Sequence, residues 1–234
     1  MGERLDKFLA SQGLGTRKEV GKLIRSGAVL VNGAPQRAPG AKVEPGADQV
    51  TAQGEEIRYQ EFLTIMLNKP AGVLSATEDR RQKTVLDLLP EGLRRRGLFP
   101  AGRLDKDTTG LLLITDDGEL AHKMLSPKSH VYKQYRAQLD APVEEADIQA
   151  FAAGVAWEGE QYAPARLWVE QDPRAAFVEI REGRFHQVKR MFQARGKTVL
   201  QLKRLKIGGL WLDSTLQEGE CRLLTPQEIQ AIFH

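Results

Sequence analysis

The feature that most constrains the fold is an acidic turn followed at once by an apolar run, within Pro100–Thr115. The run Leu111–Thr115 is short and has no helical period, which predicts a single buried β-strand. Asp105 therefore lies where a loop leaves a rigid sheet, a common position for reactive side chains because the sheet fixes their direction. Arg103 and Lys106 add positive charge nearby, and a neighbouring cation favours the ionised carboxylate that a nucleophile requires.

Taken alone, this acidic turn is weak evidence for a reactive site. An Asp beside Thr and Gly more often serves through hydrogen bonds between its side chain and the turn backbone. The rest of the chain has to decide between a structural and a chemical role for Asp105.

Positive charge is concentrated in residues 181–206, although the 234-residue chain has a formal net charge of only +3. This segment holds nine Lys or Arg residues and the single acid Glu182, which gives it a net charge of +8. Its apolar residues predict a folded helix over 185–194 with a buried face: Val188, Met191 and Phe192. Such density indicates a polyanionic partner, most simply nucleic acid, whereas the ordinary alternative is a solvated basic surface.

The remaining composition is typical of a water-soluble protein. The longest aliphatic run, Leu111–Ile114, has four residues and is far too short to span a membrane. The N-terminus is charged from its third residue and has no apolar signal core. Cys221 is the only cysteine, so no internal disulfide can form, and it is expected to be a packing residue. We therefore expect a cytoplasmic protein without a membrane segment.

The first 33 residues predict two helices followed by a strand. An i, i+3, i+4 apolar face indicates the first helix: Leu5, Phe8 and Leu9. Thr16 and Glu19 have the spacing of a capping box, which predicts a second helix over 17–26 that ends at Gly27. The dipeptide Asn32-Gly33 predicts a hairpin turn after the strand. The outer face of the second helix carries four cations, which are either ordinary surface charge or RNA contacts: Arg17, Lys18, Lys22 and Arg25.

This first unit resembles the S4 RNA-binding domain. The match is carried by Arg4–Leu9, Thr16-Arg17 and Leu23–Gly33, in order and at the family's spacing. The resemblance implies that Arg17, Lys18, Lys22 and Arg25 contact phosphates and recognise backbone shape rather than sequence. We expect an S4-like RNA-binding domain and linker over residues 1–60 and a second domain over residues 61–234.

The second domain predicts many strands, the last of them over residues 205–212, with helices packed against them, so the expected fold class is α+β. Over its whole length the chain resembles the pseudouridine synthases of the RsuA type, which isomerise a uridine in ribosomal RNA. Four motifs carry the resemblance: Gly102–Asp105, Ser126–Tyr135, Gly183–Met191 and Ile207–Leu210. Gln134 stands where Thr is frequent in the family and Lys106 where Ile is common. The resemblance implies a mixed, mainly antiparallel sheet with flanking helices.

Residue by residue, the resemblance also implies roles. Asp105 matches the catalytic aspartate, Tyr135 the active-site tyrosine and Lys189 the basic residue that pairs with the aspartate. Arg103 matches a residue that holds the target nucleotide out of its stack. Further RNA contacts are expected in the basic segment, at Arg184 and Arg190. The family implies no metal and no organic cofactor, and the sequence has no Cys/His cluster and no phosphate-binding glycine loop.

Each of these residues also has an ordinary interpretation. Tyr135 at a strand start is more often part of a core. Lys189 is also explained as one more phosphate contact on a basic helix. His186 is interpreted as a structural residue at the start of that helix. The ordered set of motifs, rather than any one residue, supports the chemical interpretation.

The expected function is isomerisation of uridine to pseudouridine in ribosomal RNA. The segment Ser126–His130 and the short C-terminus favour the small-subunit 16S rRNA, with 23S rRNA of the large subunit as the alternative. A second hypothesis is a non-catalytic RNA-binding assembly factor, which has no need of Asp105. We expect the partner to be ribosomal RNA or a ribosomal assembly intermediate, bound by a monomer.

Overall fold

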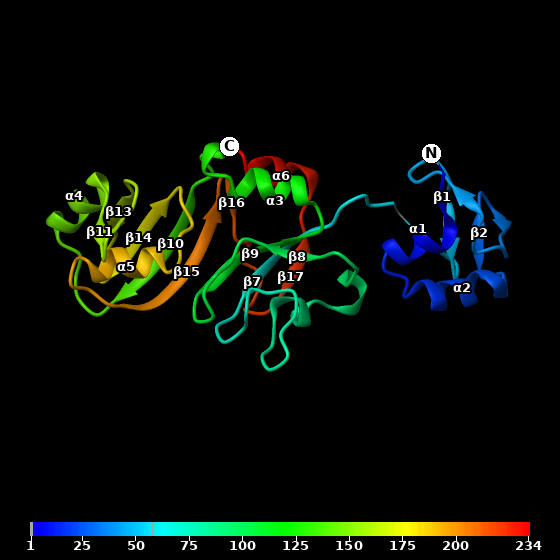
Figure 1. Cartoon of the computed structure of the whole chain (residues 1–234), viewed down its shortest axis with the longest axis horizontal. Coiled ribbons are helices and arrows are strands. Elements are labelled where there is room, and N and C mark those ends of the chain that lie inside the picture. The colour runs from blue at the N-terminus through cyan, green and yellow to red at the C-terminus, as the bar shows by residue number, and fades with distance from the viewer. Residues whose placement is uncertain (1, 58) are drawn as a thin grey trace. The chain divides into compact units, whose positions relative to one another are not determined.

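The computed structural model describes residues 2–57 and 59–234 (Figure 1). The chain divides into two compact units. Unit 1 comprises Met1–Phe62 and Leu89–Leu98, and unit 2 comprises Leu63–Leu88 and Phe99–His234. The sequence analysis assigned Leu89–Leu98 to the second domain, but its contacts group it with unit 1. One reason is Arg95, whose guanidinium donates hydrogen bonds to the carbonyls of Gln60 (2.9 Å) and Glu61 (2.8 Å).

Unit 1 consists of two helices packed against short strands. Its elements are β1 (Glu3–Arg4), α1 (Leu5–Ser11), α2 (Arg17–Ser26), β2 (Val29–Val31), β3 (Ala34–Pro35), β4 (Lys42–Val43), β5 (Val50–Ala52), β6 (Glu55–Glu56) and a 3₁₀ turn (Glu91–Leu93). The strands form a β1-β4 pair and a sheet of order β3-β2-β5-β6. The apolar faces of both helices meet the strands in one buried cluster that includes Leu5, Phe8, Ile24 and Val50.

The local signals in unit 1 work as the sequence predicts. Thr16 and Glu19 form the capping box: the Thr16 hydroxyl accepts from the Glu19 N–H, and the Glu19 carboxylate accepts from the Thr16 N–H. Gly27 ends α2 in the left-handed region, with φ +84°. Asn32 and Gly33 both have positive φ, which is the geometry of the tight hairpin turn between β2 and β3.

Unit 2 is built on one nine-stranded sheet. Seven strands follow in the order β13-β14-β10-β15-β9-β7-β17, while β16 pairs with β15 and β8 with β9. Their bounds are β7 (Thr64–Lys69), β8 (Phe99–Ala101), β9 (Thr109–Thr115), β10 (Lys133–Leu139), β13 (Arg166–Val169), β14 (Ala175–Ile180), β15 (Val199–Ile207), β16 (Leu210–Trp211) and β17 (Cys221–Leu223). A separate hairpin joins β11 (Ala156–Trp157) to β12 (Glu160–Gln161). The α+β class and the mainly antiparallel sheet are confirmed.

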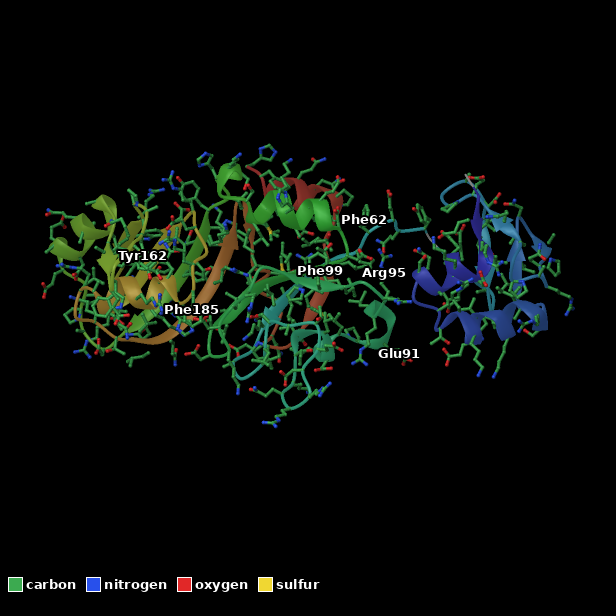
Figure 2. The ribbon with its side chains drawn as sticks, viewed as in Figure 1. Phe62, Glu91, Arg95, Phe99, Tyr162 and Phe185 are labelled. Carbon is green, nitrogen blue, oxygen red and sulfur yellow. The ribbon has the colours of Figure 1, made fainter. Side chains whose placement is uncertain are left out.

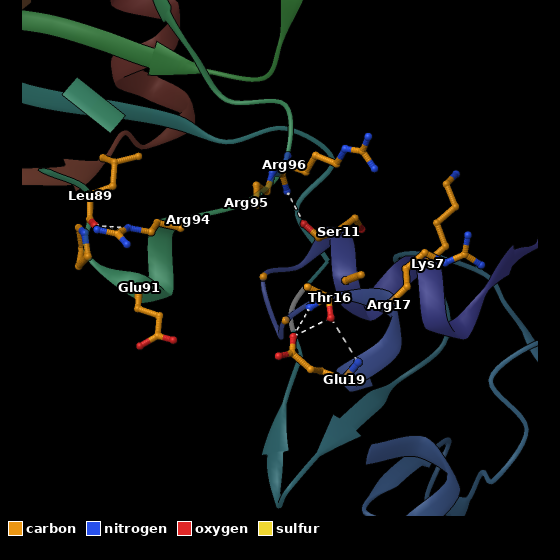
Figure 3. Close-up of a pocket in the computed structure, with 14 residues that line it drawn as sticks. Lys7, Ser11, Thr16, Arg17, Glu19, Leu89, Glu91, Arg94, Arg95 and Arg96 are labelled. Carbon is orange, nitrogen blue, oxygen red and sulfur yellow. Dashed lines mark hydrogen bonds between the residues drawn. The ribbon is translucent and has the colours of Figure 1, made fainter. Parts of the chain in front are cut away.

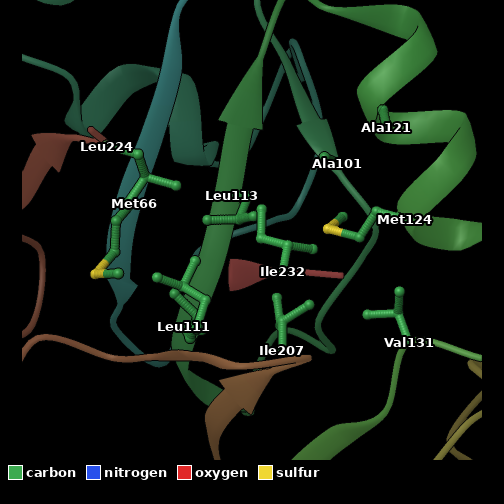
Figure 4. Packing of buried hydrophobic residues seen from close by; sticks show 11 residues of the cluster. Met66, Ala101, Leu111, Leu113, Ala121, Met124, Val131, Ile207, Leu224 and Ile232 are labelled. Carbon is green, nitrogen blue, oxygen red and sulfur yellow. The ribbon is translucent and has the colours of Figure 1, made fainter. Parts of the chain in front are cut away.

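Helices cover this sheet and close its core. They are α3 (Gly118–Leu125), α4 (Glu145–Ala153), α5 (Gln187–Gln193), α6 (Pro226–Ala231) and two 3₁₀ turns, Val85–Leu88 and Pro127–Ser129. Figure 4 shows side chains of β7 and β9 meeting those of α3 and the C-terminal segment in one buried cluster, among them Met66, Leu111, Leu113, Met124 and Ile232. None of the helices in the described ranges is long and apolar enough to cross a membrane.

Two elements differ from the sequence prediction. The basic helix α5 begins at Gln187, two residues later than expected, because His186 has φ +53° and cannot continue a right-handed helix. Strand β15 spans Val199–Ile207, whereas the apolar pattern predicted a strand only from residue 205. In the part before residue 205, the polar residues Gln201, Lys203 and Arg204 interrupt the apolar pattern.

The pair β9–β15 is the only parallel one among the described strands of this sheet, and it joins two antiparallel halves. Gly110 lies in this pair opposite Arg204, with φ +96°. A Cβ atom at position 110 would overlap the backbone carbonyl of Arg204. Glycine is therefore required here both by backbone conformation and by the close approach of the two strands. The loop that carries Asp105 leads directly into this junction.

Candidate active site

Residues 102–108 connect β8 to β9 and are called the site loop. Hydrogen bonds from other residues of unit 2 fix the backbone of this loop. The hydroxyl of Ser75 donates to the carbonyl of Leu104 (2.9 Å) and accepts from its N–H (3.1 Å). The N–H of Gly72 donates to the carbonyl of Lys106 (2.8 Å). These bonds fix the backbone on both sides of Asp105, so the direction of its side chain is set before any substrate binds.

A fully buried lysine completes this support. Lys69, at the end of β7, donates from Nζ to three backbone carbonyls: Pro70 (3.0 Å), Lys106 (3.2 Å) and Thr108 (3.0 Å). Burial lowers the pKa of Lys69 to about 8, so it is mainly protonated at neutral pH, with one N–H for each carbonyl. Nothing in the sequence near Lys69 distinguishes a buried lysine at a strand end.

The structure brings Asp105 and Lys189 together. The Lys189 ammonium, on α5, lies 3.1 Å from Oδ2 of Asp105 and 2.6 Å from Oδ1 of Asp107. Burial opposes the charge on Lys189, but the hydrogen bonds to Asp107 and Asp105 outweigh it and raise the pKa of Lys189. The hydrogen bond from Lys189 in turn lowers the pKa of Asp107. Asp105 thus faces a permanent cation while its side chain stays 24% exposed, which leaves it accessible to a substrate. Asp107 was not singled out from the sequence.

His186 also faces the Asp105 carboxylate. Its Nε2 atom lies 3.4 Å from Oδ1 of Asp105, on the opposite oxygen from Lys189. The sequence analysis interpreted His186 as structural at the helix start, and it does immediately precede α5. Its left-handed backbone turns the side chain toward the site loop, so the structure adds it to the surroundings of the carboxylate.

Tyr135 lies on β10, the strand that pairs with β15 in the sheet. It pairs with Arg204 across β10 and β15, and Arg204 pairs with Gly110 at the start of β9. The Tyr135 side chain is buried, and its hydroxyl lies 3.5 Å from Nη1 of Arg204. Arg204 is itself buried and donates from Nε to the carbonyl of Leu111 (2.7 Å). Its Nη2 atom has no hydrogen-bond partner within the described residues. Arg204 was counted only as one of many charges in the sequence.

The predicted RNA-binding residues fall into two groups. In unit 2, Arg103 is exposed on the site loop, while Arg184 and Arg190 both lie within 3.5 Å of the Glu160 carboxylate. In unit 1, the four cations of α2 are exposed: Arg17, Lys18, Lys22 and Arg25. Arg17 is also tied to the buried carboxylate of Asp6 at 2.9 Å, so part of its role is structural.

Unit 1 contains a pocket with a strongly basic lining (Figure 3). The start of α2 and the segment 89–96 contribute most of the lining, with charged residues Lys7, Arg17, Glu19, Glu91, Arg94, Arg95 and Arg96. Within this lining, Arg95 is half-buried and bonds to backbone carbonyls of unit 1. The pocket's five cationic side chains outnumber its two carboxylates, so its charge suits an anion. No cluster of three or more metal-binding side chains occurs in the described residues.

Comparison with known proteins agrees with this geometry. The sequence model of the RNA pseudouridylate synthase family matches residues 63–194, and that of the S4 domain matches residues 3–48. The chain therefore belongs to the RNA pseudouridylate synthase family. It is an RNA pseudouridine synthase of the RsuA type with an N-terminal S4 domain, as the motifs indicated.

Its relatives match along almost the whole chain. The protein named uncharacterized RNA pseudouridine synthase YtzG, of Bacillus subtilis (strain 168), is 46% identical over 98% of both chains. The ribosomal small subunit pseudouridine synthase A of Escherichia coli (strain K12) is 42% identical, over 98% of this chain and 99% of the relative. A crystal structure of a pseudouridylate synthase is 40% identical, with a TM-score of 0.68 over 98% of this chain and 99% of the other.

Proposed function

We propose that this enzyme isomerises a uridine of ribosomal RNA to pseudouridine, that its target lies in the 16S rRNA of the small subunit, and that Asp105 is the catalytic carboxylate. The observation that carries the assignment of Asp105 is its ion pair with Lys189 at 3.1 Å, inside the segment that matches the synthase family. The small-subunit target is supported by relatives named ribosomal small subunit pseudouridine synthase A at 42% identity.

The reaction breaks the bond between N1 of uracil and C1′ of ribose, turns the base, and joins C5 to C1′. An ionised carboxylate promotes the reaction in one of two ways: it acts as a nucleophile, or it assists removal of a sugar proton so that the glycosidic bond breaks. Both routes need Asp105 to be negative and fixed in direction. Lys189 supplies the compensating charge, and the carbonyl bonds of Lys69 hold the loop backbone.

The detached uracil has to be kept in place while it turns. Tyr135 is proposed to pack on the base, and its hydroxyl to take part in the late removal of the C5 proton. The neighbouring Arg204 supports this position, because its guanidinium lies 3.5 Å from the Tyr135 hydroxyl and 6.0 Å from the ring. Arg103, exposed on the same loop as Asp105, is proposed to contact the nucleotide that is drawn out of its stack.

RNA binding is assigned to the basic surfaces of both units. The exposed cations of α2 follow a helical spacing that puts Lys18, Lys22 and Arg25 on one face, as phosphate contacts require. In unit 2, Arg184 lies just before α5 and Arg190 lies within it. Their charge is partly met by Glu160, so they are expected to contribute less to phosphate binding than the cations of α2.

The direct test is to map pseudouridines in ribosomal RNA from cells with and without this gene. Loss of one 16S pseudouridine in the deletion strain, restored by the intact gene, is the expected result. Loss of a 23S site instead would move the target to the large subunit. Unchanged maps of both rRNAs would overturn the proposed substrate.

A further inference from the structure

Phe185 is an exposed aromatic side chain beside the site (Figure 2). It lies just before α5, and 66% of its surface is accessible, more than for any other large hydrophobic residue in the described part of the chain. A Phe that contributes to a core is buried, so packing within unit 2 does not explain this residue. Large exposed aromatic rings are costly to hydrate and are often retained at binding surfaces.

The ring is nevertheless held in place. Phe185 stacks on His186, with ring centroids 3.7 Å apart and an angle of 21° between the planes. The guanidinium carbon of Arg190 lies 5.1 Å from the Phe185 centroid. His186 adopts the left-handed backbone conformation that non-glycine residues rarely occupy, a strain typical of functional positions. The exposed ring is therefore pre-ordered, which reduces the entropy lost when a partner stacks on it.

This stack connects directly to the catalytic carboxylate. His186 contacts Phe185 through its ring and lies 3.4 Å from Oδ1 of Asp105 through Nε2. Lys189, which pairs with the other oxygen of Asp105, belongs to the helix that follows. A group that stacks on Phe185 is thus separated from the Asp105 carboxylate only by the His186 side chain.

A nucleobase is the partner that this arrangement fits. Drawing a uridine out of its stack leaves the neighbouring base with an uncovered face, and aromatic side chains are the usual substitute for a lost base neighbour. The flat ring supplies stacking surface, and Arg190 beside it gives positive charge that an RNA backbone favours, although Glu160 meets part of that charge. An apolar protein partner would be expected to avoid these charged neighbours.

We propose that Phe185, braced by His186, is a stacking platform for the nucleobase next to the target uridine. This inference rests on the proposed function, since it needs an RNA substrate whose target nucleotide is displaced. It adds a specificity element to the site: the identity and stacking strength of the neighbouring base, and not only the uridine, affect binding.

The test compares Phe185→Leu with Phe185→Trp in the full-length enzyme, with a 16S rRNA transcript as the probe. Leu keeps apolar bulk without a π-face, whereas Trp keeps the face. Leu200→Ala is the control, because Leu200 is 61% exposed in the same unit and is not placed in the site. We expect Phe185→Leu to weaken the Kd about tenfold and Phe185→Trp to bind within about threefold of the parent. The salt dependence should not change, because stacking neutralises no phosphate.

A second readout locates the contact. With 4-thiouridine in the transcript, ultraviolet irradiation should crosslink the peptide that contains Phe185 to a nucleotide adjacent to the pseudouridine position. Equal Kd values for Phe185→Leu and the parent, in a transcript that the parent modifies, would overturn the platform alone. Equal losses in the Leu and Trp variants would also overturn it, because they would show a packing role. No pseudouridine formation by the parent in either rRNA would overturn the proposed function, and with it the platform.

Discussion

The ammonium of Lys189 lies 3.1 Å from the carboxylate of Asp105, although the two residues come from distant segments of the chain. The site loop carries Asp105 into β9, and α5 carries Lys189 toward β15. Because β9 and β15 pair in parallel, the sheet brings the loop and the helix together. The ion pair is therefore a consequence of one strand pairing, and it gives Asp105 the charged partner that its proposed role needs.

Removing the charge of Lys189 should impair the reaction far more than removing that of Asp107. Lys189→Met leaves Asp105 without its cation, so the single-turnover rate should fall at least about a hundredfold. Asp107→Asn is the matched control, because Asp107 is 74% exposed and its loss leaves Lys189 free to pair with Asp105. Its rate should stay within about threefold of the parent. Comparable losses in the two variants would show that Asp107 is equally required.

Replacing Lys69 should destabilise unit 2. Lys69→Met leaves three backbone carbonyls, one of them fully buried, without their donor, so the free energy of unfolding should fall by about 3 kcal/mol or more. Lys106→Met is the control, because Lys106 is an exposed lysine of the same loop whose ammonium, within the described residues, donates only to the Gln82 side chain. That change should cost at most about 0.5 kcal/mol in urea denaturation. An equally small effect of Lys69→Met would contradict the support assigned to it.

Gly110 and Gly159 should differ sharply in their tolerance of alanine. Both have positive φ, but a Cβ at 159 meets open space, whereas one at 110 overlaps the Arg204 backbone. Gly159→Ala should therefore cost only the conformational strain of about 1 kcal/mol. Gly110→Ala should cost at least about 3 kcal/mol and separate β9 from β15. Equal denaturation midpoints for the two variants would show that the strand junction adapts without loss.

Stability should depend on pH through Lys133. Burial, assisted by the charge of Arg204, lowers the pKa of Lys133 to about 8, against 10.5 for an unperturbed lysine. Between these values the unfolded chain binds more protons than the folded one, so stability rises with pH. From pH 7 to pH 10 the parent should gain about 2 kcal/mol relative to Lys133→Met. Because Lys69 titrates in both proteins, its contribution cancels. Parallel stability curves would contradict the lowered pKa of Lys133.

The parts of the fold that depend on local chemistry could be predicted from sequence. The capping box of Thr16 and Glu19, the stop at Gly27 and the hairpin turn at Asn32-Gly33 each rest on contacts within a few residues. Asp105 could be proposed as the catalytic carboxylate from the sequence because a family motif surrounds it.

The parts of the fold and of the site that depend on contacts between distant segments of the chain could not be predicted from sequence. Lys69 is a hydrogen-bond donor to the site loop only because β7 ends beneath that loop, and no nearby residue signals it. Asp107 and His186 lie beside Asp105 because α5 packs against the site loop. The left-handed backbone conformation of His186 could not be predicted from the residues next to it in the sequence. The start of β15 was not predicted because Gln201, Lys203 and Arg204 interrupt its apolar pattern.

The central claim is that the negative charge of Asp105 carries out the isomerisation. Asp105→Asn keeps the size and most hydrogen bonds of the side chain while it removes the charge. Pseudouridine formation and RNA binding should be measured together on the same ribosomal RNA transcript. We expect no detectable pseudouridine from Asp105→Asn, with a Kd within about threefold of the parent. Turnover of the Asn variant at the parent rate would contradict it.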